Sequence, residues 1–135
     1  MIGTFADTFY FIALLNPSDS AHGRAVQVTR TLAGPIVTTC WVLVEVADAL
    51  SAPGFRSHVH RFLERLASDP NFRVVPANTD WYWRGVSLYG ARPDKGWSLT
   101  DCMSFVVMSE LGLRQALTSD HHFEQAGFVA TLKAE

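Results

Sequence analysis

The sequence predicts a three-layer α/β sandwich in which helices flank a central, mainly parallel sheet of four to five strands. Short apolar or β-branched runs alternate with segments of helical spacing, which favours parallel strands joined by crossover helices. The composition, 48% apolar and 18% charged, is typical of a globular protein with a sizeable core. Because the 135 residues contain no repeat, low-complexity segment or linker, we expect residues 1–135 to form one domain.

Five segments are predicted as strands because they are apolar or rich in β-branched residues and end at turns or helix starts. Ile36-Val37-Thr38-Thr39, for example, is an uninterrupted β-branched run that follows Gly34-Pro35. The predicted strands cover residues 2–6, 36–39, 72–75, 115–118 and 128–132.

Six helices are predicted between the strands from apolar residues at helical spacing and from turn residues at their ends. Asn16-Pro17 stops the first helix, and Ser18 or Ser20 would cap the second, which ends near Gly34. The predicted helices cover residues 8–15, 18–34, 41–50, 55–67, 78–89 and 98–111.

Charge is distributed unevenly along the chain, although the net charge is only −2. Residues 51–95 carry seven basic side chains against four acidic ones, for +3. The segments before and after it carry −2 and −3. An acidic pocket beside a basic segment would suit a phosphate backbone that is held by cations, although a solvated helix face explains the same arginines.

The two cysteines and the lack of a signal-peptide pattern lead us to expect a cytoplasmic protein. Cys40 and Cys102 lie far apart in apolar stretches without zinc-site spacing, so we expect reduced, buried thiols. The apolar run at residues 9–15 has no basic residue before it, unlike a signal peptide. No run approaches the ~18 apolar residues of a membrane helix. We therefore expect a soluble, cytoplasmic protein without a membrane partner.

Four acidic residues lie where strands give way to helices: Asp7, Glu45, Asp101 and Asp120. In an open α/β sheet the carboxyl ends of the strands share one edge, and ligands bind in the crevice there. Two carboxylates ~4 Å apart repel by about 4 kcal/mol at an effective dielectric constant near 20. A hard divalent cation such as Mg²⁺ or Mn²⁺ relieves that repulsion, so the sequence predicts a metal site at this edge.

Each acid also has an ordinary structural interpretation. Asp7, Asp101 and Asp120 precede or open helices, where aspartate is favoured as a cap. Ser98 and Asp101 resemble a capping box with aspartate in place of glutamate. Glu45 has mostly apolar neighbours, so its burial requires either an arginine partner or a metal ion.

Other polar residues are candidates for the surroundings of this site. The hydroxyls of Thr8 and Thr118 would lie close enough to hold a water or a phosphate oxygen, or would cap turns. Asp48 lies one turn beyond the glutamate and would either extend the site or lie on the surface. His121 and His122 would line the groove or belong to an exposed loop.

The order and spacing of these residues resemble those of the PIN-domain ribonucleases over nearly the whole chain. The shared motifs are Asp7 after the first strand, Thr39-x-x-Val42-Leu43-x-Glu45, Leu99-Thr100-Asp101, Leu117-Thr118-Ser119-Asp120 and His121-His122-Phe123-x-x-Ala126-Gly127-Phe128. Bacterial members are commonly metal-dependent endoribonucleases, and many are VapC-like toxins of type II toxin–antitoxin systems.

The resemblance implies specific roles for the acidic residues. Asp7, Glu45 and Asp101 would be the core ligands of Mg²⁺ or Mn²⁺, and Asp120 a fourth ligand. Thr118 matches a hydroxyl position near the site. The resemblance further implies a PIN-like fold, an RNA substrate, hydrolysis of its phosphodiester bonds, a cognate antitoxin and a homodimer.

Two other functions remain open from the residues alone. A nuclease that acts on DNA, or a phosphatase, would use the same carboxylates. In a non-catalytic interaction module, the acids would be helix caps and an aromatic group would form the interface. That group comprises Trp81, Tyr82, Trp83 and Tyr89.

Overall fold

The computed structural model describes residues 3–134, which form a five-stranded, fully parallel sheet with the strand order β3-β2-β1-β4-β5. Its first strand is at the centre, and the chain adds strands first on one side and then on the other. The strands are β1 (Thr4–Ala6), β2 (Ile36–Thr39), β3 (Phe72–Val75), β4 (Gln115–Leu117) and β5 (Val129–Ala130).

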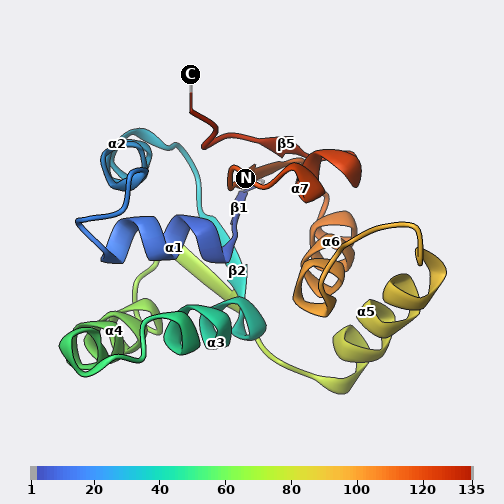
Figure 1. Cartoon of the computed structure of the whole chain (residues 1–135), viewed down its shortest axis with the longest axis horizontal. Coiled ribbons are helices and arrows are strands. Elements are labelled where there is room, and N and C mark those ends of the chain that lie inside the picture. Colours follow the sequence, from blue (N-terminus) through green and yellow to red (C-terminus); the bar gives the residue numbers. More distant parts are fainter. Residues whose placement is uncertain (1–2, 135) are drawn as a thin grey trace.

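Helices lie on both sides of these strands, as predicted for a three-layer sandwich. Figure 1 shows α1 to α4 on the left of β1 and β2, and α5 to α7 on the right. The helices are α1 (Thr8–Leu15), α2 (His22–Thr31), α3 (Cys40–Ala49), α4 (Pro53–Leu66), α5 (Thr79–Ala91), α6 (Leu99–Leu111) and α7 (His121–Gln125). In the described part of the chain, no helix combines the length and the apolarity that crossing a membrane requires.

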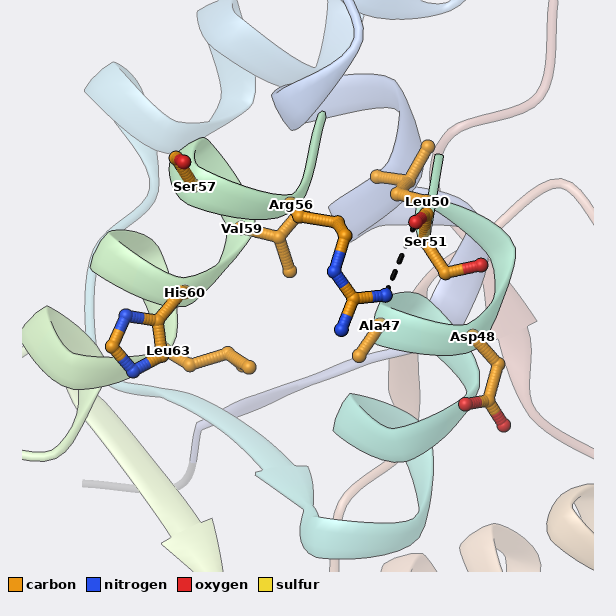
Figure 2. Close-up of a pocket in the computed structure, with 9 residues that line it drawn as sticks. All are labelled: Ala47, Asp48, Leu50, Ser51, Arg56, Ser57, Val59, His60 and Leu63. Atoms are coloured by element: carbon orange, nitrogen blue, oxygen red, sulfur yellow. Dashed lines mark hydrogen bonds between the residues drawn. The ribbon is translucent and has the colours of Figure 1, made fainter. Parts of the chain in front are cut away.

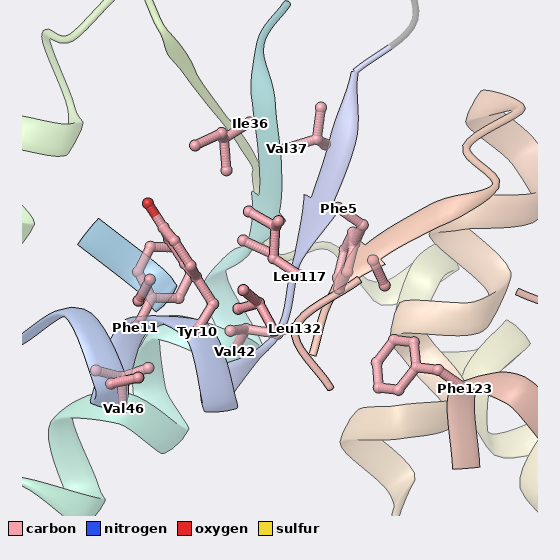
Figure 3. Packing of buried hydrophobic residues seen from close by; sticks show 14 of the residues in the cluster. Phe5, Tyr10, Phe11, Ile36, Val37, Val42, Val46, Leu117, Phe123 and Leu132 are labelled. Atoms are coloured by element: carbon pink, nitrogen blue, oxygen red, sulfur yellow. The ribbon is translucent and has the colours of Figure 1, made fainter. Parts of the chain in front are cut away.

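The core joins the two helical layers to the sheet. Phe5 of β1 is fully buried, as are Tyr10 and Phe11 of α1. Figure 3 shows these side chains converging with Leu117 on the centre of the sheet. Phe123 of α7 is also fully buried, and its burial stabilises the fold by about 1.5–3 kcal/mol.

Most predicted boundaries agree with the structure to within two residues. β2 and β3 match the prediction, and β4 and β5 are shorter than predicted. The structure of Ile2, where the first predicted strand begins, lies outside the described residues. The fourth helix begins two residues earlier than predicted, because Pro53 is the first residue of α4, where its missing N–H leaves no hydrogen bond unmade.

The predicted start of the second helix is wrong. α2 begins at His22, and its N-cap is Ala21, which makes no side-chain cap hydrogen bond. The carboxamide of Asn16 accepts a hydrogen bond from the Ser18 N–H, and the Asp19 carboxylate accepts one from the Ala21 N–H. These bonds hold the intervening residues in turns, which compete with the helix.

Helix α7 was not predicted. It has only five residues, which is too short to show a helical period. The ring of Phe123 lies 6.3 Å from that of Phe5 and 4.9 Å from that of Phe105, measured between centroids. The helix is therefore held against both the central strand and α6.

Candidate active site

Three of the four predicted acids follow neighbouring strands of the sheet, and the fourth lies at the start of α6. Asp7 directly follows β1, Asp120 follows β4, and the register pairs Ala6 with Leu117. Glu45 lies in α3, which begins immediately after β2. Asp101 lies in the first turn of α6. The parallel topology therefore brings segments from both ends of the chain to the crevice in which α/β proteins bind ligands.

The hydroxyl of Thr118 connects two of the acids. Thr118 is fully buried, and its Oγ1 donates a hydrogen bond to Asp7 Oδ2 at 2.9 Å. The same oxygen accepts a hydrogen bond from the backbone N–H of Asp120 at 3.1 Å. One side chain thus orients the carboxylate after β1 and the backbone of the loop after β4.

Asp7 carries its carboxylate in an unfavourable environment. Only 7% of the residue is exposed, and burial raises its pKa from 3.8 to about 7. Hydrogen bonds from Thr118 and from the Thr8 backbone lower the pKa, whereas the negative charges of Asp101 and Asp120 raise it. The charges of the three aspartates therefore oppose one another.

Asp101 is part of a helix cap and also lies with Asp7 and Asp120 in a set of carboxylates, here called the acidic group. Its side chain accepts a hydrogen bond from the Ser98 N–H, while the Ser98 hydroxyl accepts one from the Asp101 N–H, which completes the predicted capping box. Burial raises the pKa of Asp101, and the charge of Asp120 adds to that effect. Capping and membership of the acidic group are therefore compatible for one residue.

Asp120 is the N-cap of α7, and a histidine lies beside it. Asp120 Oδ1 accepts a hydrogen bond from the His122 N–H at 2.9 Å. The ring Nδ1 of His122 lies 3.5 Å from Asp120 Oδ1 and 3.4 Å from Asp101 Oδ2. His122 therefore lies between two carboxylates that come from different helices.

A threonine connects Glu45 to the segment that carries Asp7. Thr8 Oγ1 donates a hydrogen bond to Glu45 Oε1 at 2.6 Å, and Thr8 directly follows Asp7 in the chain. Among residues 3–134, Glu45 forms no ion pair, so the arginine partner considered from the sequence is not found.

The donor set fits a hard divalent cation. Its donors are carboxylate oxygens, which Mg²⁺ and Mn²⁺ prefer. Burial and mutual repulsion destabilise the charged forms of Asp7 and Asp101, and a bound cation would offset both effects. The same environment would be costly if the residues served only as helix caps.

Asp48 lies apart from the acidic group. It is exposed on α3 and lines a pocket of about 480 Å³ between α3 and α4. Figure 2 shows its carboxylate at the rim of this pocket, with the Arg56 side chain reaching across from α4 to the Ser51 carbonyl. Asp48 therefore has the surface position that was one of its two interpretations, and among residues 3–134 no contact joins it to the other acids.

Two basic residues lie in the segment between α5 and α6, where both contact Asp94. Arg92 lies over the ring of Trp97 at 5.3 Å, and the Trp97 indole N–H donates to Gln125 Oε1 of α7 at 3.0 Å. Lys95 lies in the same loop, just before the capping box of α6. Of the seven basic residues in segment 51–95, these two are thus close in sequence to the acidic group.

Sequence reasoning did not assign His122 its place between two carboxylates. The only sequence signal was its proximity to Asp120, which applies equally to the exposed His121. The short helix α7 determines which of the two imidazoles turns inward, and that helix was not predicted.

Comparison with known proteins agrees with this fold. VapC20 of Mycobacterium tuberculosis, described as a 23S rRNA-specific endonuclease, is 30% identical over 129 residues, which cover 93% of this chain and 95% of that protein. The crystal structure of VapC20, described as a sarcin–ricin loop cleaving toxin, matches with a TM-score of 0.86 and 28% identity, over 96% of this chain and 99% of that one.

Two more distant structures share the fold. FitAcB from Neisseria gonorrhoeae has a TM-score of 0.64 and 19% identity over 94% of each chain. A toxin–antitoxin complex from Klebsiella pneumoniae has a TM-score of 0.62 and 16% identity over 88% of each chain. The family model described as PIN domain matches residues 4–129. The resemblance noted in the sequence is therefore confirmed, and the chain belongs to the PIN-domain family.

Proposed function

We propose that this protein is a metal-dependent endoribonuclease, a VapC-like toxin that hydrolyses phosphodiester bonds in RNA. The observation that carries the proposal is the acidic group, in which Asp7, Asp101 and Asp120 come from three segments and the charges of Asp101 and Asp120 raise the pKa of Asp7. The 30% identity to VapC20, which is described as an rRNA endonuclease, supports the RNA substrate. Intact and fragmented 23S rRNA is therefore the first substrate to test.

The proposed ligands of Mg²⁺ or Mn²⁺ are Asp7, Glu45, Asp101 and Asp120. When bound, the cation would lower the pKa of a water molecule and neutralise charge that develops on the phosphate oxygens. Thr118 would hold the Asp7 carboxylate in one orientation, and Thr8 would do the same for Glu45. These hydrogen bonds limit the movement of the donors before the substrate arrives.

RNA would be held by basic side chains of the segment before α6 as well as by the cation. Arg92 and Lys95 precede the capping box of α6 and would contact backbone phosphates on either side of the cleaved bond. Because such contacts release counterions, substrate affinity should fall as the salt concentration rises.

Three further parts of the proposal concern the setting of the enzyme. We expect an antitoxin partner, because VapC20 is described as a toxin. We expect a homodimer, because large apolar side chains such as Trp83 and Tyr89 are exposed on α5. We expect residues 1–135 to act as one domain in the cytoplasm, where the free thiols of Cys40 and Cys102 would stay reduced.

The test is cleavage of an RNA pool that includes 23S rRNA, with Mg²⁺ or Mn²⁺ and with EDTA. We expect metal-dependent cleavage that falls roughly 100-fold or more in Asp7→Asn and in Asp101→Asn, because each change removes a main electrostatic stabiliser. Asp48→Asn, which removes an exposed acid on α3, is the matched control and should cleave normally.

Two other outcomes of this test would assign the protein a different function. Cleavage of single-stranded DNA or of a small phosphate ester in preference to RNA would show that the same carboxylates serve another hydrolase. A folded protein that binds Mn²⁺ but cleaves none of these substrates would instead favour the non-catalytic interaction module.

A further inference from the structure

Three residues at the start of α7 offer nitrogen donors beside the acidic group. Asp120, His121 and His122 each present one potential metal-binding atom, and these atoms all lie within 4.8 Å of one another. The rings of the two histidines lie side by side, with their centroids 4.4 Å apart. Among the described residues, this is the one group of three or more His, Cys, Asp or Glu side chains with such spacing.

The distances from Asp120 to the two histidines fit a tetrahedral cation. Asp120 Oδ1 lies 3.6 Å from His121 Nδ1 and 3.5 Å from His122 Nδ1. With bonds of about 2.0–2.2 Å, a tetrahedral zinc ion separates its ligands by about 3.3–3.6 Å. An octahedral magnesium ion, with bonds of about 2.0–2.1 Å, would require about 2.9 Å between adjacent ligands.

We propose that Asp120, His121 and His122 form a second metal site that binds Zn²⁺ or a similar borderline cation. Two imidazoles with one carboxylate are a donor set that suits zinc and leaves a fourth position open, whereas magnesium prefers oxygen donors. Neither Cys40 nor Cys102 belongs to the group, so the site is formed by nitrogen and oxygen donors.

The second site shares Asp120 with the proposed magnesium or manganese site. Zinc bound to Asp120 would occupy a carboxylate that the other cation needs, and it would also engage His122, which lies 3.4 Å from Asp101. Zn²⁺ would therefore inhibit RNA cleavage even when Mg²⁺ is in excess. This consequence rests on the proposed function, whereas binding of zinc does not.

Cobalt absorption tests the site directly, because tetrahedral Co²⁺ absorbs visible light much more strongly than octahedral Co²⁺. The full chain, purified without a histidine tag and stripped of metal, is titrated with Co²⁺ and then Zn²⁺ in excess Mg²⁺. We expect one equivalent of tetrahedral Co²⁺ that Zn²⁺ displaces. His121→Ala should lower the Co²⁺ affinity by roughly tenfold or more, because even partners of metal ligands contribute that much.

Control variants separate this site from other histidines and thiols. His58→Ala removes an exposed imidazole from α4, and Cys40→Ser removes a thiol, so both should bind Co²⁺ like the wild type. His121 is exposed, so its replacement should leave the fold intact, and His122→Gln provides a second variant of the site. Octahedral or absent Co²⁺ absorption, or unchanged affinity in His121→Ala, would overturn the proposal.

The same titration keeps this inference separate from the proposed function. Asp7→Asn should lose RNA cleavage but keep the tetrahedral Co²⁺ signal, because Asp7 is not one of the three ligands. A protein that binds Zn²⁺ through His121 without cleaving RNA would support the second site and contradict the endoribonuclease. Cleavage that zinc does not inhibit, together with tetrahedral binding, would show that the two sites do not compete for Asp120 and would overturn that part of the proposal.

Discussion

At the scale of single residues, Asp7 combines a charged side chain with a buried position. Its carboxyl group has a pKa of about 7 in the folded protein, compared with 3.8 for an ordinary aspartate. The folded state therefore binds the proton more tightly than the unfolded state does. This tighter proton binding raises the free energy of unfolding below pH 4, and the added stability is lost as the pH rises through 7.

The first prediction concerns the stability of the metal-free protein as a function of pH. A pKa difference of this size corresponds to up to about 4 kcal/mol between the two ends of the range. We expect Asp7→Asn to be more stable than the wild type at pH 8, to lose most of that advantage by pH 5 and to lose the rest below pH 4. Urea unfolding in EDTA at several pH values measures this difference, and a difference that stays constant with pH would contradict the assignment.

The second prediction concerns Thr118, whose hydroxyl has two partners. Thr118→Val removes the hydrogen bond to Asp7 and leaves the Asp120 N–H without its acceptor, at a cost of about 1–3 kcal/mol. Because the Thr118 hydrogen bond lowers the pKa of Asp7, its loss should raise that pKa further. Urea unfolding and Mn²⁺ titration measure the two effects, and Thr118→Ser, which keeps the hydroxyl, should behave like the wild type.

At the scale of secondary structure, two helix starts determine where the acids lie. Asp101 is held by the capping box of α6, and Asp120 is held by the cap of α7. Aromatic packing holds the two helices together, because the ring of Phe105 in α6 packs against the ring of Phe123 in α7. Positions of carboxylates in the site therefore depend on ordinary capping and packing interactions.

The third prediction tests the capping box. Ser98→Ala removes the acceptor of the Asp101 N–H hydrogen bond and should destabilise the protein by about 0.5–2 kcal/mol. Because Asp101 then loses part of its restraint, Mn²⁺ affinity should fall as well. Thermal unfolding and Mn²⁺ titration measure these changes, and Ser98→Asp, which restores a capping side chain, should recover most of the stability.

The fourth prediction tests the anchor of α7. Phe123→Leu leaves part of the space of the ring empty and should destabilise the protein, although by less than the about 3–5 kcal/mol expected for alanine. We expect RNA cleavage to fall even under conditions in which the variant is fully folded, because α7 carries Asp120. Cleavage assays at a temperature where the variant is fully folded separate the two effects; unchanged cleavage there would show that α7 does not need this anchor.

At the scale of the whole molecule, much of the fold could be predicted because its signals are local. β2 is a β-branched run, and the turn at Asp69-Pro70 marks the start of β3, so both strands were placed correctly. The parallel topology then implied that acids after different strands would meet. By contrast, the hydrogen bond between Thr118 and Asp7 joins residues 111 positions apart and has no local signal.

The fifth prediction concerns assembly of two chains. Trp83 is 61% exposed on α5 and packs edge-on against Tyr82, with ring centroids 4.9 Å apart. If this surface is the dimer interface, Trp83→Arg should convert dimers to monomers in sedimentation experiments without changing thermal stability of the monomer. A wild type that remains monomeric at high concentration would contradict the proposed homodimer.

The position of the first strand at the centre of the sheet also affects synthesis of the protein. Asp7 leaves the ribosome 111 residues before Thr118, which follows the strand on the other side of β1. The acidic group therefore cannot assemble on a nascent chain that stops before β4. Chains whose translation stops before β4 would lack the site, so a cell that makes this protein would be exposed to its activity only after synthesis has passed Asp120.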